Sequence, residues 1–273
     1  DGTLILGTSG GTQTYNGGLT TTSVSGTVTL NGTIATSNDA VVLGAVTLGS
    51  ATTVDTNSSD TTGDITIGAV TGGSNSLTLS TGDNVANTDI SASGAISGVT
   101  TLTLSDVGGT ATLSADVDVT TLTVGNTVAN VAFTGNGSSV ASAVSFANDG
   151  TLILGTSGGT QTYNGGLTTT SVGSTVTLNG TIASSDDAVV LGAVTLASAT
   201  TIDTNSTTTN RADITIAAIT GGSNTLTLTT ENNITGSDIT ASGAISGVTT
   251  LTLASVGGTA TLSGDVDVTT LAV

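Results

Sequence analysis

The 273-residue chain contains no cysteine, histidine, proline, methionine or tryptophan, and its only basic residue is Arg211. Without cysteine it has no disulfide framework, no thiolate zinc site and no thiol redox chemistry. Without histidine or cysteine it also lacks the side chains of the usual nucleophilic relays, and no other catalytic set stands out. We therefore expect a protein that is not an enzyme.

Aromatic residues are almost absent: the chain has only Tyr15, Tyr163, Phe133 and Phe146. A globular core usually depends on aromatic bulk. The interior of this chain must instead consist of Val, Leu, Ile and Ala in many similar, thin layers. Most other residues are Thr, Ser, Gly, Asn and Asp, which favour strands and turns over helices. An all-β fold follows.

Charge of one sign dominates, because 19 acidic residues face one basic residue, for a formal net charge of −18. Such a chain repels nucleic acid phosphates and anionic membrane surfaces, so we expect neither as a partner. There is also no apolar run of about 18 residues that could insert into a membrane. Cations are the natural counterpart, and Ca²⁺ is the metal that Asp and Asn oxygens suit best.

The sequence contains a long internal repeat. Residues Asp1–Leu19 return unchanged at Asp149–Leu167. The period is 148 residues, and it becomes 149 after one insertion within residues 207–212. We predict two modules, 1–148 and 149–273, of which the second is an incomplete copy of the first. Duplication of a whole surface favours a structural role over a unique active site. It is also typical of a piece of a longer repetitive protein.

Short apolar–polar–apolar triplets recur along the chain, and alternation of this kind predicts strands with one buried face. The triplets begin at Val28, Val46, Ile65, Leu77, Leu102, Val117, Leu122 and Val144. Between them we expect turns with positive φ at Asn31-Gly32, Gly72–Asn75, Gly108-Gly109 and Gly125-Asn126.

Two architectures hold many short strands. An immunoglobulin-like sandwich commonly has aromatic core anchors, which this chain lacks. A parallel β-helix (β-solenoid) stacks coils of short strands around a narrow aliphatic core, and it fits better. We therefore predict an elongated rod of about 21 residues per coil, which gives about seven coils and a rise of about 34 Å per module at ~4.8 Å per coil.

Residue spacings give a first estimate of the coil register. The steps from Val28 to Val46, from Val46 to Ile65 and from Leu102 to Leu122 are each close to one coil length, so we expect each pair to be stacked one coil apart. Leu77, Ile90 and Leu102 follow one another at little more than half that spacing, which suggests two faces of a single coil.

Threonine occupies most outward positions of these triplets, as at Thr29, Thr78 and Thr103. High β propensity accounts for this pattern. An ice-binding or glycan-contacting array is the functional alternative, but an ice-binding plane needs Thr-x-Thr in register on successive coils. We expect the sequence not to keep that register.

The candidate metal ligands are two Asp pairs. Asp116 and Asp118 flank inward-facing Val117, and Asp265 and Asp267 repeat the arrangement in the second copy. Alternation places both carboxylates of a pair outward and about 7 Å apart, too far for a shared proton but close enough to contribute to a Ca²⁺ site. Solvated surface charge is the alternative, and no other cofactor is expected.

The rhythm of the chain resembles the repeat regions of very large bacterial surface proteins of the filamentous-haemagglutinin-like, β-strand-repeat type. The likeness is carried by residues 45–48, 63–73, 77–79, 94–98 and 102–104. It implies a right-handed parallel β-helix in an exported shaft, stalk or fibre, often with adhesive modules. The acidic, Thr-rich, Cys-free composition also resembles surface-layer proteins.

The function expected from the sequence is a structural repeat segment of an extracellular bacterial filament, fibre or adhesin stalk. Its main partner would be the chain itself, associating end to end and laterally, because uncapped strand edges associate. Contact with a glycan or cell surface is a further expectation. The alternatives are a surface-layer protein and a carbohydrate-binding β-helix, the latter disfavoured by the scarcity of aromatic residues.

Overall fold

The computed structural model describes residues 2–82, 85–205, 211–230 and 235–273. Within these ranges the chain contains strands and turns but no helix, and parallel strands stack in about 12 coils. The prediction of an all-β parallel β-helix is therefore confirmed. Most of the predicted insertion, at residues 207–212, lies outside the described residues.

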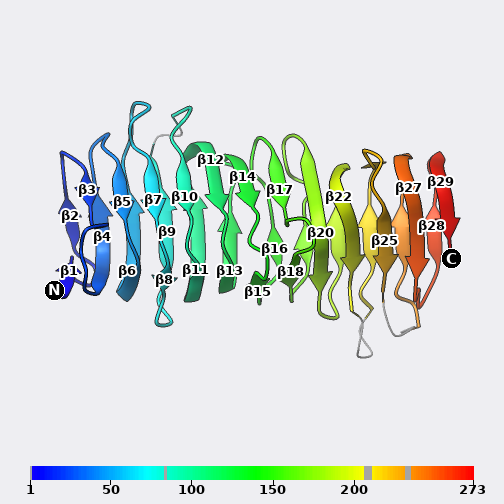
Figure 1. The fold of residues 1–273 in the computed structure, drawn as a ribbon, viewed down its shortest axis with the longest axis horizontal. Coiled ribbons are helices and arrows are strands. Elements are labelled where there is room, and N and C mark those ends of the chain that lie inside the picture. The colour runs from blue at the N-terminus through cyan, green and yellow to red at the C-terminus, as the bar shows by residue number, and fades with distance from the viewer. Residues whose placement is uncertain (1, 83–84, 206–210, 231–234) are drawn as a thin grey trace. The chain divides into compact units, whose positions relative to one another are not determined.

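By its contacts the chain divides into two compact units, coloured blue to green and green to red in Figure 1. Unit 1 comprises Asp1–Thr134 and Asn148–Gly150, and unit 2 comprises Gly135–Ala147 and Thr151–Val273. The strands of unit 1 are β1 (Leu4–Leu6), β2 (Thr12–Thr14), β3 (Leu19–Thr20), β4 (Val28–Ala35), β5 (Val41–Leu43), β6 (Val46–Asp55), β7 (Ile65–Ile67), β8 (Val70–Thr71), β9 (Leu77–Ser80), β10 (Ile90–Ala92), β11 (Ile96–Ser105), β12 (Val107–Leu113), β13 (Val117–Val124) and β14 (Val128–Phe133).

From β17 onward, unit 2 largely repeats this order of short and long strands. Its strands are β15 (Ser139–Val140), β16 (Val144–Ser145), β17 (Leu152–Leu154), β18 (Thr160–Tyr163), β19 (Leu167–Thr168), β20 (Val176–Ser184), β21 (Val189–Leu191), β22 (Val194–Asp203), β23 (Ile214–Ile216), β24 (Ile219–Thr220), β25 (Leu226–Thr229), β26 (Ile239–Ala241), β27 (Ile245–Ala254), β28 (Ala260–Leu262) and β29 (Val266–Ala272).

Inward side chains of successive coils stack in three columns in unit 1, and every pairing is parallel. The first column is Leu4, Val28, Val46, Val70, Ile96 and Val117. The second is Gln13, Ile34, Val54, Leu79, Leu104 and Val124. The third is Leu19, Val41, Ile65, Ile90, Ala111 and Val131.

The same columns recur in unit 2 with nearly the same residues. The first runs through Leu152, Val176, Val194, Ile219, Ile245 and Val266. The third runs through Val144, Leu167, Val189, Ile214, Ile239 and Ala260. The repeat therefore specifies its own coil register.

Strand β4 shows how the sequence encodes this core. Val28, Leu30 and Ile34 are 2%, 0% and 0% exposed, whereas Thr29 and Thr33 between them are half-buried. Burying a Val, Leu or Ile side chain contributes about 1.5–3 kcal/mol. Stacked aliphatic layers thus provide the cohesion that aromatic residues supply in other cores.

Two of the three predicted spacings are confirmed and one is wrong. Val28 pairs with Val46, and Leu102 pairs with Leu122. Val46, however, pairs with Val70, which lies beyond Ile65 in the sequence, while Ile65 itself lies in the third column. The strands are too similar in composition for the sequence to show which face each belongs to.

The ambiguity at Leu77, Ile90 and Leu102 is resolved as two faces of one coil. Leu77 pairs with Leu102, while Ile90 lies between them in sequence and pairs with Ile65 and Ala111.

Only some of the glycine-containing segments form the predicted turns. Gly73 and Ser74 have φ of 55° and 65°, as expected of a turn. Gly32 also has positive φ (63°) but lies inside β4, where the register shifts between Leu30 and Gly32. The prediction of a turn at Gly108-Gly109 is wrong, because both glycines lie within β12.

An inner threonine ladder lies at the corner after the second column of unit 1, formed by Thr36, Thr56 and Thr81 at 2%, 0% and 0% exposure. The Thr56 hydroxyl donates to the carbonyls of Gly63 (2.6 Å) and Thr81 (3.2 Å), and Thr81 donates to Asp106 (2.7 Å). Buried carbonyls need such donors where the chain leaves the sheet. The counterparts in unit 2 are Ser184, Thr204 and Thr230.

Candidate functional site

The outward face of the second column carries threonine at the same position on successive coils. In the described part of unit 1, this outer threonine ladder comprises Thr12, Thr33, Thr53, Thr78, Thr103 and Thr123. In unit 2 it comprises Thr160, Thr181, Thr201, Thr227 and Thr252. Parallel pairing spaces the coils by about 4.8 Å, so the hydroxyls form a regular row.

The expectation that Thr-x-Thr loses its register from coil to coil is therefore wrong for part of the chain. Thr101 and Thr103 lie directly over Thr121 and Thr123. In unit 2, Thr250 lies over Thr270, although Thr252 meets Ala272. Unequal loops between the strands absorb the differences in coil length, so the strands stay aligned where sequence spacing alone suggests that they do not.

The two predicted calcium pairs lie at equivalent places at the start of β13 and β29. Asp118 is exposed and pairs with Ser97, and Asp267 is exposed and pairs with Ser246. Asp116 and Asp265 precede these strands, and their carbonyls accept from the amides of Ile96 (2.9 Å) and Ile245 (2.8 Å).

Ca²⁺ takes six to eight oxygen ligands. Within the described ranges, no three His, Cys, Asp or Glu side chains come together in a way that could hold a metal ion. Each Asp pair would thus leave most ligand positions to carbonyls, hydroxyls and water. The calcium site stays a prediction.

Other Asp carboxylates bond the edge of the third column, a role that the sequence reasoning missed. Oδ1 of Asp64 accepts from the amide of Asp89 (2.9 Å), and Oδ1 of Asp89 accepts from the amide of Thr110 (2.7 Å). In unit 2, Asp213 and Asp238 do the same for the amides of Asp238 (2.8 Å) and Thr259 (2.6 Å). The signal was an Asp-Ile dipeptide that recurs once, one coil further on, in each copy.

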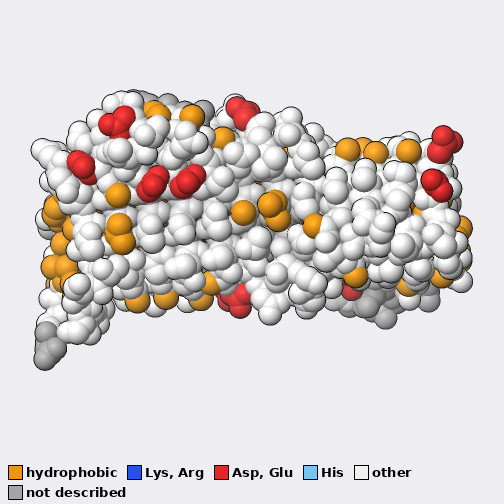
Figure 2. All heavy atoms as spheres, turned by 45° about the horizontal axis from the view of Figure 1, so that its top comes forward, with side chains coloured by type: hydrophobic (Ala, Val, Ile, Leu, Met, Phe, Trp, Pro, Cys, Tyr) orange, Lys and Arg blue, Asp and Glu red, His pale blue; other side chains and the backbone are white. Residues whose placement is uncertain are grey.

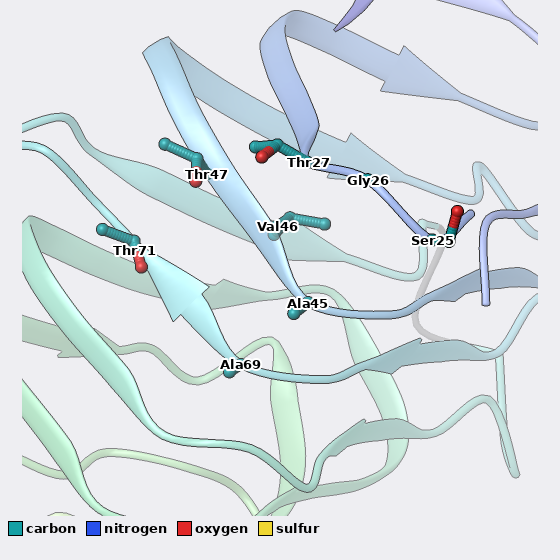
Figure 3. Close-up of a pocket in the computed structure, with 8 residues that line it drawn as sticks. All are labelled: Ser25, Gly26, Thr27, Ala45, Val46, Thr47, Ala69 and Thr71. Carbon is teal, nitrogen blue, oxygen red and sulfur yellow. The ribbon is translucent and has the colours of Figure 1, made fainter. Parts of the chain in front are cut away.

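Shallow grooves lie beside the first column at equivalent places in both copies. In unit 1 the groove has a volume of about 410 Å³ and lies over β6 and β8, where Figure 3 shows Thr47 and Thr71 side by side with Ala45 and Ala69 at the strand starts. The unit 2 counterpart, of about 200 Å³, is lined by Thr195, Thr220, Ala193, Ala218 and neighbouring residues. Such small hydroxyl and methyl groups can contact a polymer chain but offer no acid or base.

Acidic groups are scattered on the face drawn in Figure 2, among uncharged polar side chains and small apolar ones. Acidic residues are distributed unevenly along the sequence. No Asp or Glu occurs in residues 2–38, 119–148 or 150–185. Each copy therefore carries an uncharged stretch at its start, and the first copy ends in one.

The repeated segment Asp1–Leu19 and Asp149–Leu167 has two different environments. Tyr163 is fully buried, and its ring meets Phe146 edge to face with centroids 6.5 Å apart. Burial raises the pKa of Tyr163 far above its ordinary value. Its counterpart Tyr15 is only half-buried, although its hydroxyl likewise bonds the preceding Gln, Gln13 (2.7 Å).

No protein-family model, curated protein or solved structure matches the chain. Along the described residues, no helix has the length and apolar character needed to cross a membrane.

Proposed function

We propose that this chain is a structural repeat segment of an extracellular bacterial filament, fibre or adhesin stalk that assembles end to end. The observation that carries the proposal is the agreement between the copies. The inward columns and the outer threonine ladder of unit 1 recur in unit 2, except that Ala272 occupies the position of Thr123. Selection for one binding or catalytic site does not require duplication of a whole surface, whereas a modular shaft does.

Apolar strand positions support the association between copies. In β13, Val117 and Leu122 are 0% and 4% exposed. An apolar strand edge favours pairing with another coil. The small aliphatic core suits a shaft, because each coil needs only its neighbours for burial.

Electron microscopy of the purified chain, with and without a calcium chelator, tests this function. Thin, unbranched filaments with an axial repeat near one module are expected. Loss of the filaments on chelation would assign the Asp pairs a bridging role. Filaments that persist on chelation would show that assembly does not require calcium. Flat two-dimensional lattices would favour the surface-layer alternative, and discrete particles would contradict the filament.

The register of the outer threonine ladder favours one further candidate, a surface that binds ice. Hydroxyls repeat about every 4.8 Å along the ladder and about 7 Å across Thr101 and Thr103. A thermal-hysteresis assay tests this function, with Thr78→Lys in the middle of the ladder as the disrupting variant and Thr66→Lys on the third column as its control. Hysteresis that Thr78→Lys alone removes would support ice binding, and no hysteresis would exclude it.

A carbohydrate-binding β-helix remains the alternative from a different class. The repeated grooves are its support, because they offer hydroxyl groups at equivalent positions in both copies. A glycan array in which no glycan binds would contradict it.

A further inference from the structure

The corner before the third column carries opposite charge in the two copies. In unit 1 this corner, residues 57–63, contains Asp60 and no basic residue. The aligned stretch of unit 2, residues 205–212, contains Arg211, the only basic residue of the chain, and no acidic residue. Asp60 and Arg211 are both exposed. The one insertion between the copies therefore falls where the sign of the charge changes.

The unit 1 corner holds the Asp60 carboxylate in a fixed position. Its Oδ1 accepts from the amide of Thr62 (3.0 Å) and from the Thr62 hydroxyl (2.6 Å). The Asp60 carbonyl accepts from the hydroxyl of Ser58 (2.6 Å), a fully buried residue. The amide of Ser59 donates to Oδ1 of Asn38 (2.6 Å). A carboxylate held in this way has little conformational entropy left to lose when it binds a cation.

The Arg211 guanidinium lies against the backbone of the next coil. Space for it exists because residue 236 is glycine: a Cβ there would lie 2.6 Å from Nε and 2.8 Å from Cζ of Arg211. The counterpart of Gly236 in unit 1 is Asn87. The residue after Arg211, Ala212, is fully buried, and its carbonyl accepts from the hydroxyl of Thr204 (2.8 Å). The arginine and the glycine that accommodates it are thus both specific to the second copy.

The charge of the whole chain shows what such a pair of corners can do. With a net charge of −18, two copies repel each other at most points of contact. A contact between Arg211 of one copy and the corner 57–63 of another is attractive instead. Exposed ion pairs contribute little affinity, but they select the orientation in which two molecules meet. The contact would therefore fix the register of two neighbouring chains.

We propose that Arg211 is a docking residue for the corner 57–63 of a second copy of this chain, with Asp60 as its partner. The proposal rests on the proposed assembly and adds a lateral contact to it, in which unit 2 of one chain meets unit 1 of another. Both hydrogen bonds within the corner use Oδ1, so Oδ2 can accept from the planar fork of N–H donors of the guanidinium.

Arg211→Lys provides the test, because the sequence contains no lysine. The variant keeps the positive charge and adds one side-chain amine, the only one in the sequence. A carbodiimide activates a carboxylate, and an amine in contact with it displaces the activating group as a urea and forms an amide. Isotope-labelled and unlabelled chains are mixed, so that mass spectrometry separates bonds between chains from bonds within one chain. We expect a cross-link between chains, at Asp60.

Asp60→Asn in the Arg211→Lys chain removes the partner carboxylate but keeps Oδ1 as an acceptor for Thr62. The cross-linked dimer should be lost, with no change in melting temperature. The matched control is Asp118→Asn, which removes the same charge from another exposed site of unit 1 and should leave the dimer intact. Salt supplies a second control. The Debye length falls from about 10 Å at 0.1 M to about 3 Å at 1 M, so the yield of dimer should fall several-fold at about 1 M salt.

Exchanging the two charges keeps the contact testable if Asp60→Asn disturbs the corner. A chain with Asp60→Lys and Arg211→Asp places the amine in unit 1 and the carboxylate in unit 2. The cross-link between chains should return in this variant, with the same dependence on salt. A chain with Asp60→Lys alone has a positive charge at both corners and should give no cross-link between these two positions.

The outcomes distinguish this contact from the proposed function. A cross-link only within one chain, to Glu231 or to any other carboxylate, would overturn the docking residue. No cross-link, or a dimer that Asp60→Asn does not remove, would also overturn it. Filaments in the microscope together with any of these results would retain the filament function. A cross-link at Asp60 between chains that form no filaments would retain the lateral contact and overturn the filament function.

Discussion

The ring of Tyr163 meets that of Phe146 edge to face, at an angle of 82° and a centroid distance of 6.5 Å. The Tyr163 hydroxyl donates to Oε1 of Gln161 (3.0 Å), so the polar end of the ring is satisfied without water. Two of the four aromatic side chains of this protein thus lie together at one coil contact in a core that is mostly aliphatic.

Replacing Tyr163 by Ala should destabilise unit 2 strongly, because it removes a fully buried ring and leaves a cavity. We expect a loss of about 3–5 kcal/mol in the free energy of unfolding, measured by urea denaturation. The control is Tyr15→Ala, in the identical local sequence but half-buried. Its loss should be less than half as large, and equal losses would contradict the two environments.

Stability should fall above about pH 10, because burial holds the pKa of Tyr163 far above its ordinary value. The unfolded chain then loses the phenolic proton while the folded chain keeps it. The stabilisation is complete below the unfolded pKa of about 10, and is lost by about 1.4 kcal/mol per pH unit as the pH rises above it. Urea titrations between pH 8 and 11 measure this slope. Tyr163→Phe should remove it, and an unchanged slope in that variant would show that another group is responsible.

Asp89→Ala should cost about 0.5–1.5 kcal/mol, because the half-buried amide of Thr110 loses its acceptor at an exposed hydrogen bond. Hydrogen exchange at that amide should accelerate. Asp89→Asn is the matched variant, since it keeps Oδ1 as an acceptor while removing a negative charge. It should be nearly neutral in thermal unfolding, and a large loss there would mean that the charge, and not the hydrogen bond, is what matters.

Thr56→Val preserves the shape of a side chain in the inner threonine ladder but removes the hydroxyl that bonds Gly63 and Thr81. The Gly63 carbonyl then loses this donor, whereas the Thr81 carbonyl still accepts from the amide of Ser58 (2.8 Å), and we expect a loss of about 1–3 kcal/mol. Thr53→Val, on the outward face of β6, which ends just before Thr56, should change stability by no more than about 0.5 kcal/mol. Similar values for the two variants in chemical denaturation would contradict the structural role of the inner ladder.

Alternation along each strand was sufficient to predict the fold class and the inward residues, because it depends only on neighbours in sequence. Register was harder, as Val46 and Ile65 show. The step from Val46 to its partner Val70 is longer than the step from Val28 to Val46, since the corner loops differ in length. No local pattern states the length of a loop between two similar strands.

The candidate sites, too, were predictable only where they depend on neighbours in sequence. The Asp pairs beside Val117 and Val266 could be named from sequence, but the bridging role of Asp64 and Asp89 depends on which strands are neighbours. Gly108-Gly109 was misassigned as a turn because glycine is also accepted where backbones approach closely. A Cβ on Gly109 would lie 2.9 Å from the carbonyl oxygen of Thr88.

The duplicated tyrosines also make the molecule its own spectroscopic reporter. With two tyrosines and no tryptophan, its intrinsic fluorescence arises at only two places, one inside a covered coil and one at an open edge. Acrylamide should quench the second emission far more readily than the first. A single Tyr→Phe substitution leaves one emitter, so the cover over either coil can be followed in solution without an attached dye.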